Sequence, residues 1–330
     1  MPVNDNMDKI KLIMDVDPGI DDSLALLLAG LSPEIELLAI TVVSGNIEVD
    51  QAARNAKFSM RMIGRDDVMI AKGCARPIHR NYVDATDTHG IDGIGEMYFP
   101  KEEPEDHGSA IEVITRLLRL YPHQITIAAL GPLSNLATIL KQDPEVLSLA
   151  KEIIIMGGSV NVCGNCSPVA EYNFWCDPHA AKIFFDANVH NVTLVPLDVT
   201  YKILLTPNMR EMIRQFKTPL SEYVTNITGF YVDFHWAQER TLGCVINDPL
   251  VIAYILDRSI LNCKFGQVQV ETEGIAMGES VVDFRQSDVR LTSAIAQSVD
   301  AKRFFKLFLT RLFSEHKSDI DLMIEKRMII

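Results

Sequence analysis

Four aspartates lie within eight residues near the start of the chain, directly after an apolar run. They are Asp15, Asp17, Asp21 and Asp22. Carboxylates this close together repel one another, so their clustering indicates a cation that neutralises them. Oxygen-only ligands in an irregular turn suit a hard cation, either Ca²⁺ or Mg²⁺. The cluster therefore predicts a site with metal-dependent chemistry.

The elements around these aspartates place them at one edge of a predicted sheet. The apolar run Ile10–Val16 predicts a buried strand. A turn is expected at Pro18-Gly19, followed by a helix that begins near Asp21. In open α/β sheets, ligands bind outside the carboxyl ends of the strands. The aspartates are thus expected where such a sheet offers a binding site.

Polar residues also follow several later predicted strands. They are Ser44, Asn46, Ser134, Asn135, Asn165, Glu171 and Asn173. Taken singly, each is explained equally well as a turn or helix-capping residue. Because the carboxyl ends of parallel strands share one rim, the set as a whole predicts a common pocket.

Predicted strands and helices alternate through most of the chain. Strands are expected at residues 10–16, 35–43, 68–71, 125–130, 152–156 and 192–197, and helices at 49–63, 109–120, 133–140, 178–185 and 301–313. Alternation of this kind favours an α/β fold: a single domain over residues 1–330 with a mostly parallel open sheet flanked by helices, as in Rossmann-like proteins. The long loop 75–106 is expected to be functional, and residues 159–177 are expected to form a second irregular loop.

In the last third of the chain, the sequence no longer predicts alternating strands and helices. Residues 207–254 look mainly helical, and 267–271 with 280–284 predict a late β-hairpin. The tail 317–330 has no assignment, so the core is expected over about residues 10–310.

The composition excludes some partners. The formal net charge of −13 disfavours phosphate-driven binding of nucleic acid. No apolar run has the length of a membrane span, and the first residues lack a signal-peptide pattern. We therefore expect a cytoplasmic protein that binds neither nucleic acid nor membranes.

Two further motifs have competing explanations. Cys163 and Cys166 form a single C-x-x-C without a second pair, so neither zinc nor thioredoxin-like chemistry is expected. They flank Asn165, and the effect of their oxidation on that loop stays a hypothesis. Asp248-Pro249 is explained as an N-cap and first residue of a helix, with a ligand role as an equal alternative.

Together these motifs resemble those of the inosine–uridine-type nucleoside hydrolases. In chain order they are Asp15–Asp22, Thr41–Asn46, His89-Gly90, Leu130–Asn135, Met156–Gly158, Gly164–Asn173 and Asn247–Leu250. The resemblance covers about residues 10 to 310. It implies Ca²⁺-dependent hydrolysis of the N-glycosidic bond of ribonucleosides, giving free base and ribose, by a homodimer or homotetramer.

The resemblance also implies roles for individual residues. The Ca²⁺ ligands would be Asp17, Asp22, Asp248 and the backbone carbonyl of Leu130, with Asp17 also acting as general base. The residues expected to bind the substrate are Asp21, Asn46, Asn165, Glu171, Asn173 and Asn247. Asp15 is expected to support the loop from behind. Cleavage builds an oxocarbenium-like cation, which a pocket rich in carboxylates would stabilise.

One departure from the family concerns the leaving base. Many members carry a histidine directly before the late aspartate, where this chain has Asn247, and an amide is no general acid. His89 is the first candidate to contact the base, with a loop-ordering hydrogen bond as the alternative. Further candidates in the predicted helical wall are Tyr231, His235, Trp236, Arg240 and Cys244. The preferred base therefore stays open.

Three other classes of protein share single features with this chain. A Mg²⁺ phosphatase of the haloacid-dehalogenase type also begins with a strand and Asp-x-Asp, but Asp21 and Asp22 would repel a phosphate. An EF-hand loop fails on the spacing of its glycine and last glutamate. A catalytically weak nucleoside-binding protein with the same fold is the remaining alternative, which the loss of histidine at Asn247 favours and an intact Asp17 opposes.

Overall fold

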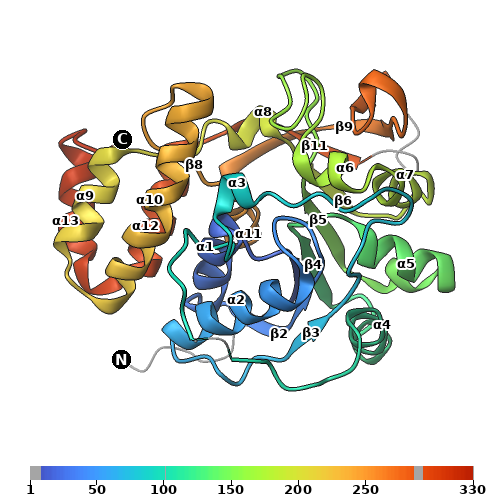
Figure 1. Ribbon diagram of the computed structural model, residues 1–330, viewed down its shortest axis with the longest axis horizontal. Coiled ribbons are helices and arrows are strands. Elements are labelled where there is room, and N and C mark those ends of the chain that lie inside the picture. The colour runs from blue at the N-terminus through green and yellow to red at the C-terminus, as the bar shows by residue number, and fades with distance from the viewer. Residues whose placement is uncertain (1–8, 101, 286–292, 330) are drawn as a thin grey trace.

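The computed structural model describes residues 9–100, 102–285 and 293–329. The expectations for the first eight residues therefore lie outside the described part. Within it, the core is a nine-stranded sheet with the order β10-β9-β11-β6-β5-β4-β1-β2-β3 (Figure 1). The strands of this sheet are β1 Ile10–Val16, β2 Ile35–Val42, β3 Ile70–Lys72, β4 Ile125–Ala129, β5 Glu152–Met156, β6 Val192–Val195, β9 Leu261–Val270, β10 Ser280–Asp283 and β11 Ser293–Val299. A separate pair joins β7 Leu204–Leu205 to β8 Cys244–Val245.

The strand order confirms the predicted Rossmann-like sheet and locates its switch point. The strand β1 pairs in parallel with both β2 and β4, while β5, β6 and β11 continue the parallel sheet beyond β4. The chain builds the sheet outwards from β1 through β2 to β3 and then returns to the other side of β1 with β4, so that a crevice opens at the carboxyl ends of β1 and β4. Asp15, opposite Thr41 and Ala129 in the register, lies at this end of β1.

Helices cover both faces of the sheet. They are α1 Ile20–Gly30, α2 Val49–Met62, α4 Ala110–Leu120, α5 Ser134–Gln142, α7 Pro178–Asp186, α11 Pro249–Leu256, α12 Ala301–Leu312 and α13 Lys317–Glu325. On β1, Leu12 and Met14 pack into the core on the side of α1, and Ile13 packs into the core on the side of α4. Both faces are buried, which is why β1 reads as a continuous apolar run.

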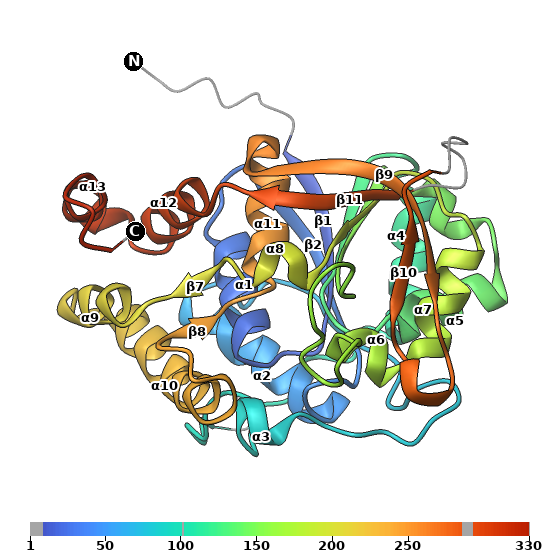
Figure 2. The ribbon, with the colours of Figure 1, turned by 90° about the horizontal axis from the view of Figure 1, so that it is seen from above.

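A helical wall stands over the crevice. The helices α9 Pro207–Gln215 and α10 Pro219–Glu239 pack together at one end of the molecule, near α12 and α13 (Figure 1). Viewed from above, α10 lies beside the short helix α3 Thr86–His89 (Figure 2). Two other short helices are α6 Tyr172–Cys176 and α8 Leu197–Thr200. The wall and the loop that carries α3 therefore meet at the rim (Figure 2).

The late elements differ in part from the prediction. The hairpin of β9 and β10 is confirmed, but β9 begins earlier, at Leu261. The strand β11 was missed because its sequence, Ser293–Val299, is only weakly apolar, yet it joins β6 to β9. The tail without an assignment contains α13, whose Ile320 and Ile324 are buried in the core. In the described part of the chain, no helix combines the length and apolarity needed to cross a membrane.

The segment 207–254 is not continuously helical. Arg240 ends α10 in the left-handed conformation, and Gly243 follows with a φ of +126°. A side chain at Gly243 would meet the carbonyl of Leu205 at 2.6 Å. This break lets β8 form and brings Asn247 back over the rim of the sheet.

Candidate active site

A cavity of about 590 Å³ lies at the carboxyl ends of the central strands. Nine of the eleven residues that were assigned to the site line it: Asp21, Asn46, His89, Leu130, Asn165, Glu171, Asn173, Asn247 and Asp248. The other two, Asp17 and Asp22, are fully buried and contact Asn46. The fold thus gathers residues from six separate segments of the chain around one cavity.

The aspartate turn is folded by its own carboxylates. The backbone N–H groups of Asp17 and Gly19 donate to the two carboxylate oxygens of Asp22, at 3.2 and 3.1 Å. Asn46, after β2, donates its backbone N–H to Asp17 Oδ2 at 2.7 Å and its amide to Asp22 at 3.1 Å. A Cβ at Gly45 would lie 2.0 Å from Asp17 Oδ2, so glycine is required there. The ends of β1 and β2 are therefore locked to each other.

The acidic residues at the bottom of the cavity, which we call its floor, are suited to bind a hard cation. Oxygens of Asp21, Asp22 and Asp248 lie within 4.8 Å of one another. Asp17 Oδ1 is buried and has no hydrogen-bond partner. Burial raises the pKa of Asp22 to about 7, and burial together with neighbouring aspartates raises the pKa values of Asp17 and Asp248 well above their ordinary range. An all-oxygen set with an unpartnered carboxylate oxygen suits Ca²⁺ or Mg²⁺.

The membership of this group differs from the expected ligand set. The resemblance implies that Asp21 binds the substrate and Asp17 the metal, whereas the oxygens that lie close together are those of Asp21, Asp22 and Asp248. Asp17 Oδ2 accepts from the backbone N–H of Asn46, and Asp17 Oδ1 is the oxygen without a partner. Asp248 is the N-cap residue directly before α11, yet its side chain makes no capping hydrogen bond, so capping does not account for it.

The carbonyl of Leu130, the fourth expected ligand, also borders the cavity. It accepts a hydrogen bond of 2.7 Å from the amide of Asn173, which leaves one lone pair for another partner. Glu171 caps α6, because it accepts from the backbone N–H groups of Asn173, Phe174 and Gly158. Burial raises the pKa of Glu171 to about 7. Asn165 lies exposed at the rim and accepts from the backbone of Tyr172 at 2.9 Å.

Three polar residues of the predicted rim face away from the cavity. Asp15 is fully buried and accepts from Thr41 at 2.6 Å and Asn135 at 2.8 Å, and burial raises its pKa to about 6. Ser134 donates to Asp177 at 2.6 Å. These groups join neighbouring elements behind the site, which for Asp15 is the expected supporting position.

Asn247 is directed at Asp21. Its amide Nδ2 donates to Asp21 Oδ2 at 2.9 Å, and the hydroxyl of Tyr231 donates to the same oxygen at 3.3 Å. Asn247 Oδ1 is buried and has no hydrogen-bond partner. The residue in the histidine position thus presents an unused acceptor at the cavity.

The histidines of the cavity are already engaged. His89 Nδ1 accepts from the backbone N–H of Ile20 at 3.1 Å, so the loop-ordering hydrogen bond is present. Burial lowers the pKa of His89. His235 uses both ring nitrogens, one with the carbonyl of Tyr231 at 2.8 Å and one with the N–H of Val245 at 3.4 Å. Only Nε2 of His89 is left to meet a substrate.

The other candidates from the helical wall differ in whether they line the cavity. Of the five candidates, Tyr231 and His235 line the cavity, whereas Trp236, Arg240 and Cys244 do not. The reasoning from sequence missed other lining residues: Asp84, Asp87, Tyr172, Trp175, Tyr201, Phe234, Gln238 and Glu239. The spacing of 231, 234, 235 and 238 marks one face of a helix, and this signal was available in the sequence.

The long loop that carries His89 is braced against α2. Asn55 of α2 donates to the carbonyls of Pro18, at 3.0 Å, and Asp92, at 2.8 Å, and Gln51 donates to its Oδ1 at 2.9 Å. The two carbonyls belong to the aspartate turn and to the His89 loop. A single buried amide therefore connects the aspartate turn at the floor of the cavity to the His89 loop that forms one of its walls.

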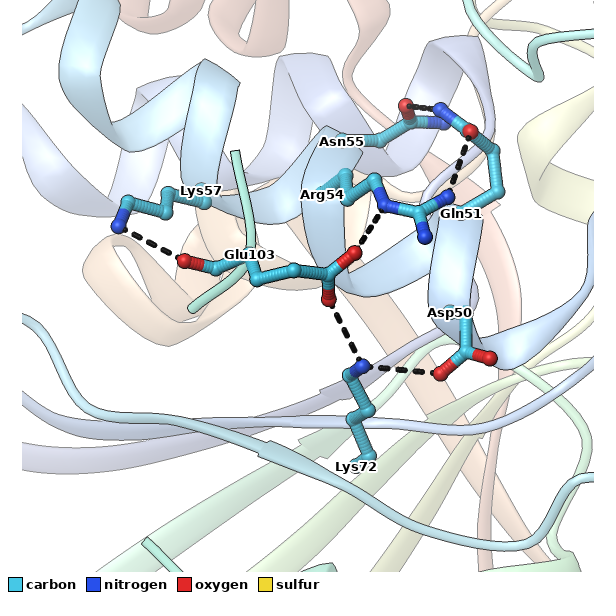
Figure 3. Close-up of polar contacts among 7 residues, drawn as sticks. All are labelled: Asp50, Gln51, Arg54, Asn55, Lys57, Lys72 and Glu103. Atoms are coloured by element: carbon cyan, nitrogen blue, oxygen red, sulfur yellow. Dashed lines mark hydrogen bonds and ion pairs between the residues drawn. The ribbon is translucent and has the colours of Figure 1, made fainter. Parts of the chain in front are cut away.

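An ion-pair cluster on the outer face of α2 holds the same loop (Figure 3). Glu103 pairs with Arg54 and with Lys72, the latter at 2.9 Å, and Lys72 also reaches Asp50 at 2.9 Å. Lys57 donates to the backbone carbonyl of Glu103 at 3.0 Å. These charges are partly exposed, so their pairs contribute little stability each.

Replacing Asn55 with leucine is expected to destabilise the protein by about 1–3 kcal/mol, because two buried carbonyls lose their donor. Activity per folded molecule should fall as well, since the aspartate turn and the His89 loop lose the amide that connects them. Denaturant unfolding with activity assays on the folded fraction measures both effects. Glu103→Gln is the matched control in the exposed cluster, with an expected change of less than about 1 kcal/mol. Equal effects of the two substitutions would contradict a special role of Asn55.

The fold and the site define an α/β enzyme with an acidic, cation-compatible pocket at a sheet switch point. The sequence profile of the family described as "Inosine-uridine preferring nucleoside hydrolase" matches residues 12–306. The chain therefore belongs to this family of nucleoside hydrolases, which act on N-glycosyl bonds. Membership excludes the phosphatase alternative.

Relatives support the assignment over most of the chain. An "Inosine-uridine preferring nucleoside hydrolase" of Leishmania major is 35% identical over 307 residues, which cover 92% of this chain and 97% of the relative. A "Pyrimidine-specific ribonucleoside hydrolase RihA" of Salmonella newport is 32% identical, covering 92% and 98%. The solved structure of a "Purine-Preferring Ribonucleoside Hydrolase" from Gardnerella vaginalis has a TM-score of 0.87 and 32% identity, covering 93% and 99%.

Proposed function

We propose that this protein hydrolyses the N-glycosidic bond of ribonucleosides with the aid of Ca²⁺, releasing free base and ribose. The observation that carries the proposal is the buried, unpartnered Oδ1 of Asp17 beside the grouped carboxylates of Asp21, Asp22 and Asp248. A binding protein has no need of such a free carboxylate oxygen. A hydrolase needs one as general base.

The proposed cation ligands are Asp17, Asp22, Asp248 and the carbonyl of Leu130, with Asp21 beside them. A bound Ca²⁺ would lower the pKa of water at the site. Asp17 then accepts the proton of the attacking water. Carboxylates around the cavity stabilise the positive charge that develops on the ribosyl group.

The proposed contacts to ribose come from Asp21, Asn46, Asn165, Glu171 and Asn173, which line the cavity around this floor. Glu171 is held by three backbone N–H groups, so its carboxylate is fixed before substrate arrives. Fixed acceptors bind the hydroxyls without reorganising, and their binding energy can be expressed in the transition state. Asn247 and Nε2 of His89 are the proposed contacts to the base side.

Relatives of similar identity differ in the base that their names specify, pyrimidine in one and purine in another. The proposal therefore extends to ribonucleosides as a class. Free ribose is measured from inosine, adenosine, guanosine, uridine and cytidine, with Ca²⁺ and after chelation. Ca²⁺-dependent release from any of them supports the proposal. Ribose and Ca²⁺ binding without release from any riboside would instead identify a binding protein.

The 2′-hydroxyl is expected to be essential. Turnover of 2′-deoxyinosine should be at least about 100-fold slower than turnover of inosine, because a buried polar site built for a hydroxyl rejects the analogue without one. The measurement is kcat/KM for both nucleosides under the same Ca²⁺ concentration. Comparable values would exclude the proposed ribose contacts.

We also propose that the chain forms a homodimer or homotetramer, as its family resemblance implies. Light scattering of the purified protein measures the mass directly, and a monomeric mass would refute this proposal.

A further inference from the structure

The cavity is acidic beyond what the floor requires. Six acidic residues line it: Asp21, Asp84, Asp87, Glu171, Glu239 and Asp248. Among the described residues, no lysine or arginine lines it. Asp84 and Asp87 belong to the His89 loop and Glu239 ends α10, so these three lie on the two walls rather than at the floor. They are exposed at the mouth, where an incoming base would pass.

The same walls offer few groups that could protonate a leaving base. Asn247 is an amide, and its Nδ2 is committed to Asp21. Both nitrogens of His235 are engaged with backbone groups. The hydroxyl of Tyr231 donates to Asp21, and His89 keeps only Nε2. The walls above the floor are thus well supplied with acceptors and poorly supplied with acids.

Asn247 supplies an independent sign of the missing partner. The residue is 8% exposed and lines the cavity, and its Oδ1 has no hydrogen-bond partner. A buried acceptor without a partner is unfavourable unless a ligand satisfies it. The ligand that satisfies it has a donor or a positively charged edge at this point.

We propose, on the basis of the function proposed above, that the preferred substrates are ribosides whose base carries a fixed positive charge. Pyridinium ribosides and N7-alkylated purine ribosides are of this class. The acidic residues that line the cavity attract the positively charged base of such a riboside. Asn247 Oδ1 then accepts from the electropositive edge of that base. A neutral nucleoside gains neither interaction.

The chemistry of such a substrate matches the scarcity of acids. When the C1′–N bond breaks, its electron pair passes to the ring nitrogen and the cationic base becomes neutral. Water forms the new C1′–O bond, and its proton goes to Asp17 and then to solvent. The products are ribose, a neutral base and one proton, so no group needs to protonate the base. A neutral nucleoside instead expels an anion unless an acid protonates it.

The first test compares 7-methylguanosine with guanosine, and nicotinamide riboside with uridine, by kcat/KM in the presence of Ca²⁺. The expected preference for the cationic member of each pair is about 100-fold or more. Cationic and neutral ribosides hydrolysed at similar rates would overturn the inference while leaving the proposed function intact. No turnover of any riboside would mean that the proposed function itself fails.

Variants separate the effect of the site from the greater lability of a cationic riboside. Replacing the three wall acids together, D84N/D87N/E239Q, should reduce the ratio of kcat/KM for 7-methylguanosine to kcat/KM for guanosine, because the cationic base loses their attraction. The expected reduction is only about tenfold, since solvent screens these charges at the exposed mouth. Glu211→Gln makes the same kind of change on the exposed surface of α9 and should leave the ratio unchanged. A triple variant with an unchanged ratio would refute the role of the acidic walls.

Asn247→His tests the scarcity of acids by adding an acid to the wall of the cavity. A histidine at this position should raise kcat/KM for guanosine by about 10- to 100-fold at pH 6, as expected for a general acid. The rise in kcat/KM for 7-methylguanosine should be smaller, because its base leaves without being protonated. The gain should disappear as the histidine loses its proton at higher pH. An equal effect on both ribosides would contradict the inference.

Discussion

Asp17→Asn is expected to lower kcat for ribonucleoside hydrolysis by about 10³-fold or more. The substitution keeps the size of the side chain and removes the carboxylate whose Oδ1 is buried without a partner. An amide cannot accept the proton of the attacking water, and it weakens the proposed cation site at the same time. Initial rates of ribose release at saturating substrate measure this loss.

The matched control for Asp17 is Asp177→Asn. Asp177 is also fully buried, but its carboxylate caps α7 and accepts from Ser134 and Ile78, away from the cavity. This variant is expected to lose about 1–2 kcal/mol of stability and keep most of its kcat. Circular dichroism confirms that both variants are folded. A folded Asp17→Asn protein with wild-type kcat would exclude Asp17 as general base.

Removal of divalent cations is expected to abolish activity and lower the thermal stability. Chelation should reduce the rate by at least about 100-fold, and Ca²⁺ should restore it. Ca²⁺ at 1,000 times its Kd adds about 4 kcal/mol to the free energy of unfolding. For a chain of 330 residues this corresponds to a rise in Tm of about 5 °C or more. Differential scanning calorimetry with and without chelator measures the shift.

The pH dependence of the chelated protein gives a second readout. Burial raises the pKa of Asp15 to about 6 and those of Asp22 and Glu171 to about 7, above the values of an unfolded chain. The native state therefore binds more protons between about pH 4 and pH 7, and its stability falls as the pH rises through this window. The Tm in chelator should be lower at pH 8 than at pH 6. Bound Ca²⁺ opposes this trend, because a cation favours the ionised carboxylates.

Asp248→Asn identifies the carboxylates that are responsible for the cation effect. Removing one member of the Asp21, Asp22 and Asp248 group should eliminate most of the Ca²⁺-dependent rise in Tm. Asp198→Asn is the control, because Asp198 is a buried aspartate that holds the backbone of Val160 and Asn161 outside the cavity lining. A wild-type response to Ca²⁺ in Asp248→Asn would place the cation elsewhere.

Much of the fold and the aspartate turn could be predicted from local sequence. The strand Ile10–Val16 was predicted at its observed bounds, because a fully buried strand leaves a continuous apolar run. The helix after Pro18-Gly19 and the helix that begins at Pro178, which Asp177 caps, depend on neighbouring residues in the chain. Alternation of such elements was sufficient for the parallel sheet, since only a few connections between them are allowed.

The tertiary structure alone decided where the side chains of the site point and which residues they contact. Asn247 and Asp21 are 226 residues apart, and only the return of the chain after Gly243 brings them into contact. In the same way, the grouping of Asp21 with Asp248 and the engagement of His89 by Ile20 depend on packing between distant elements. Sequence spacing determines which face of an element a residue occupies, but long-range packing determines which charges meet there. The residue types at the rim therefore predicted the chemistry, and the fold decided which of them act together.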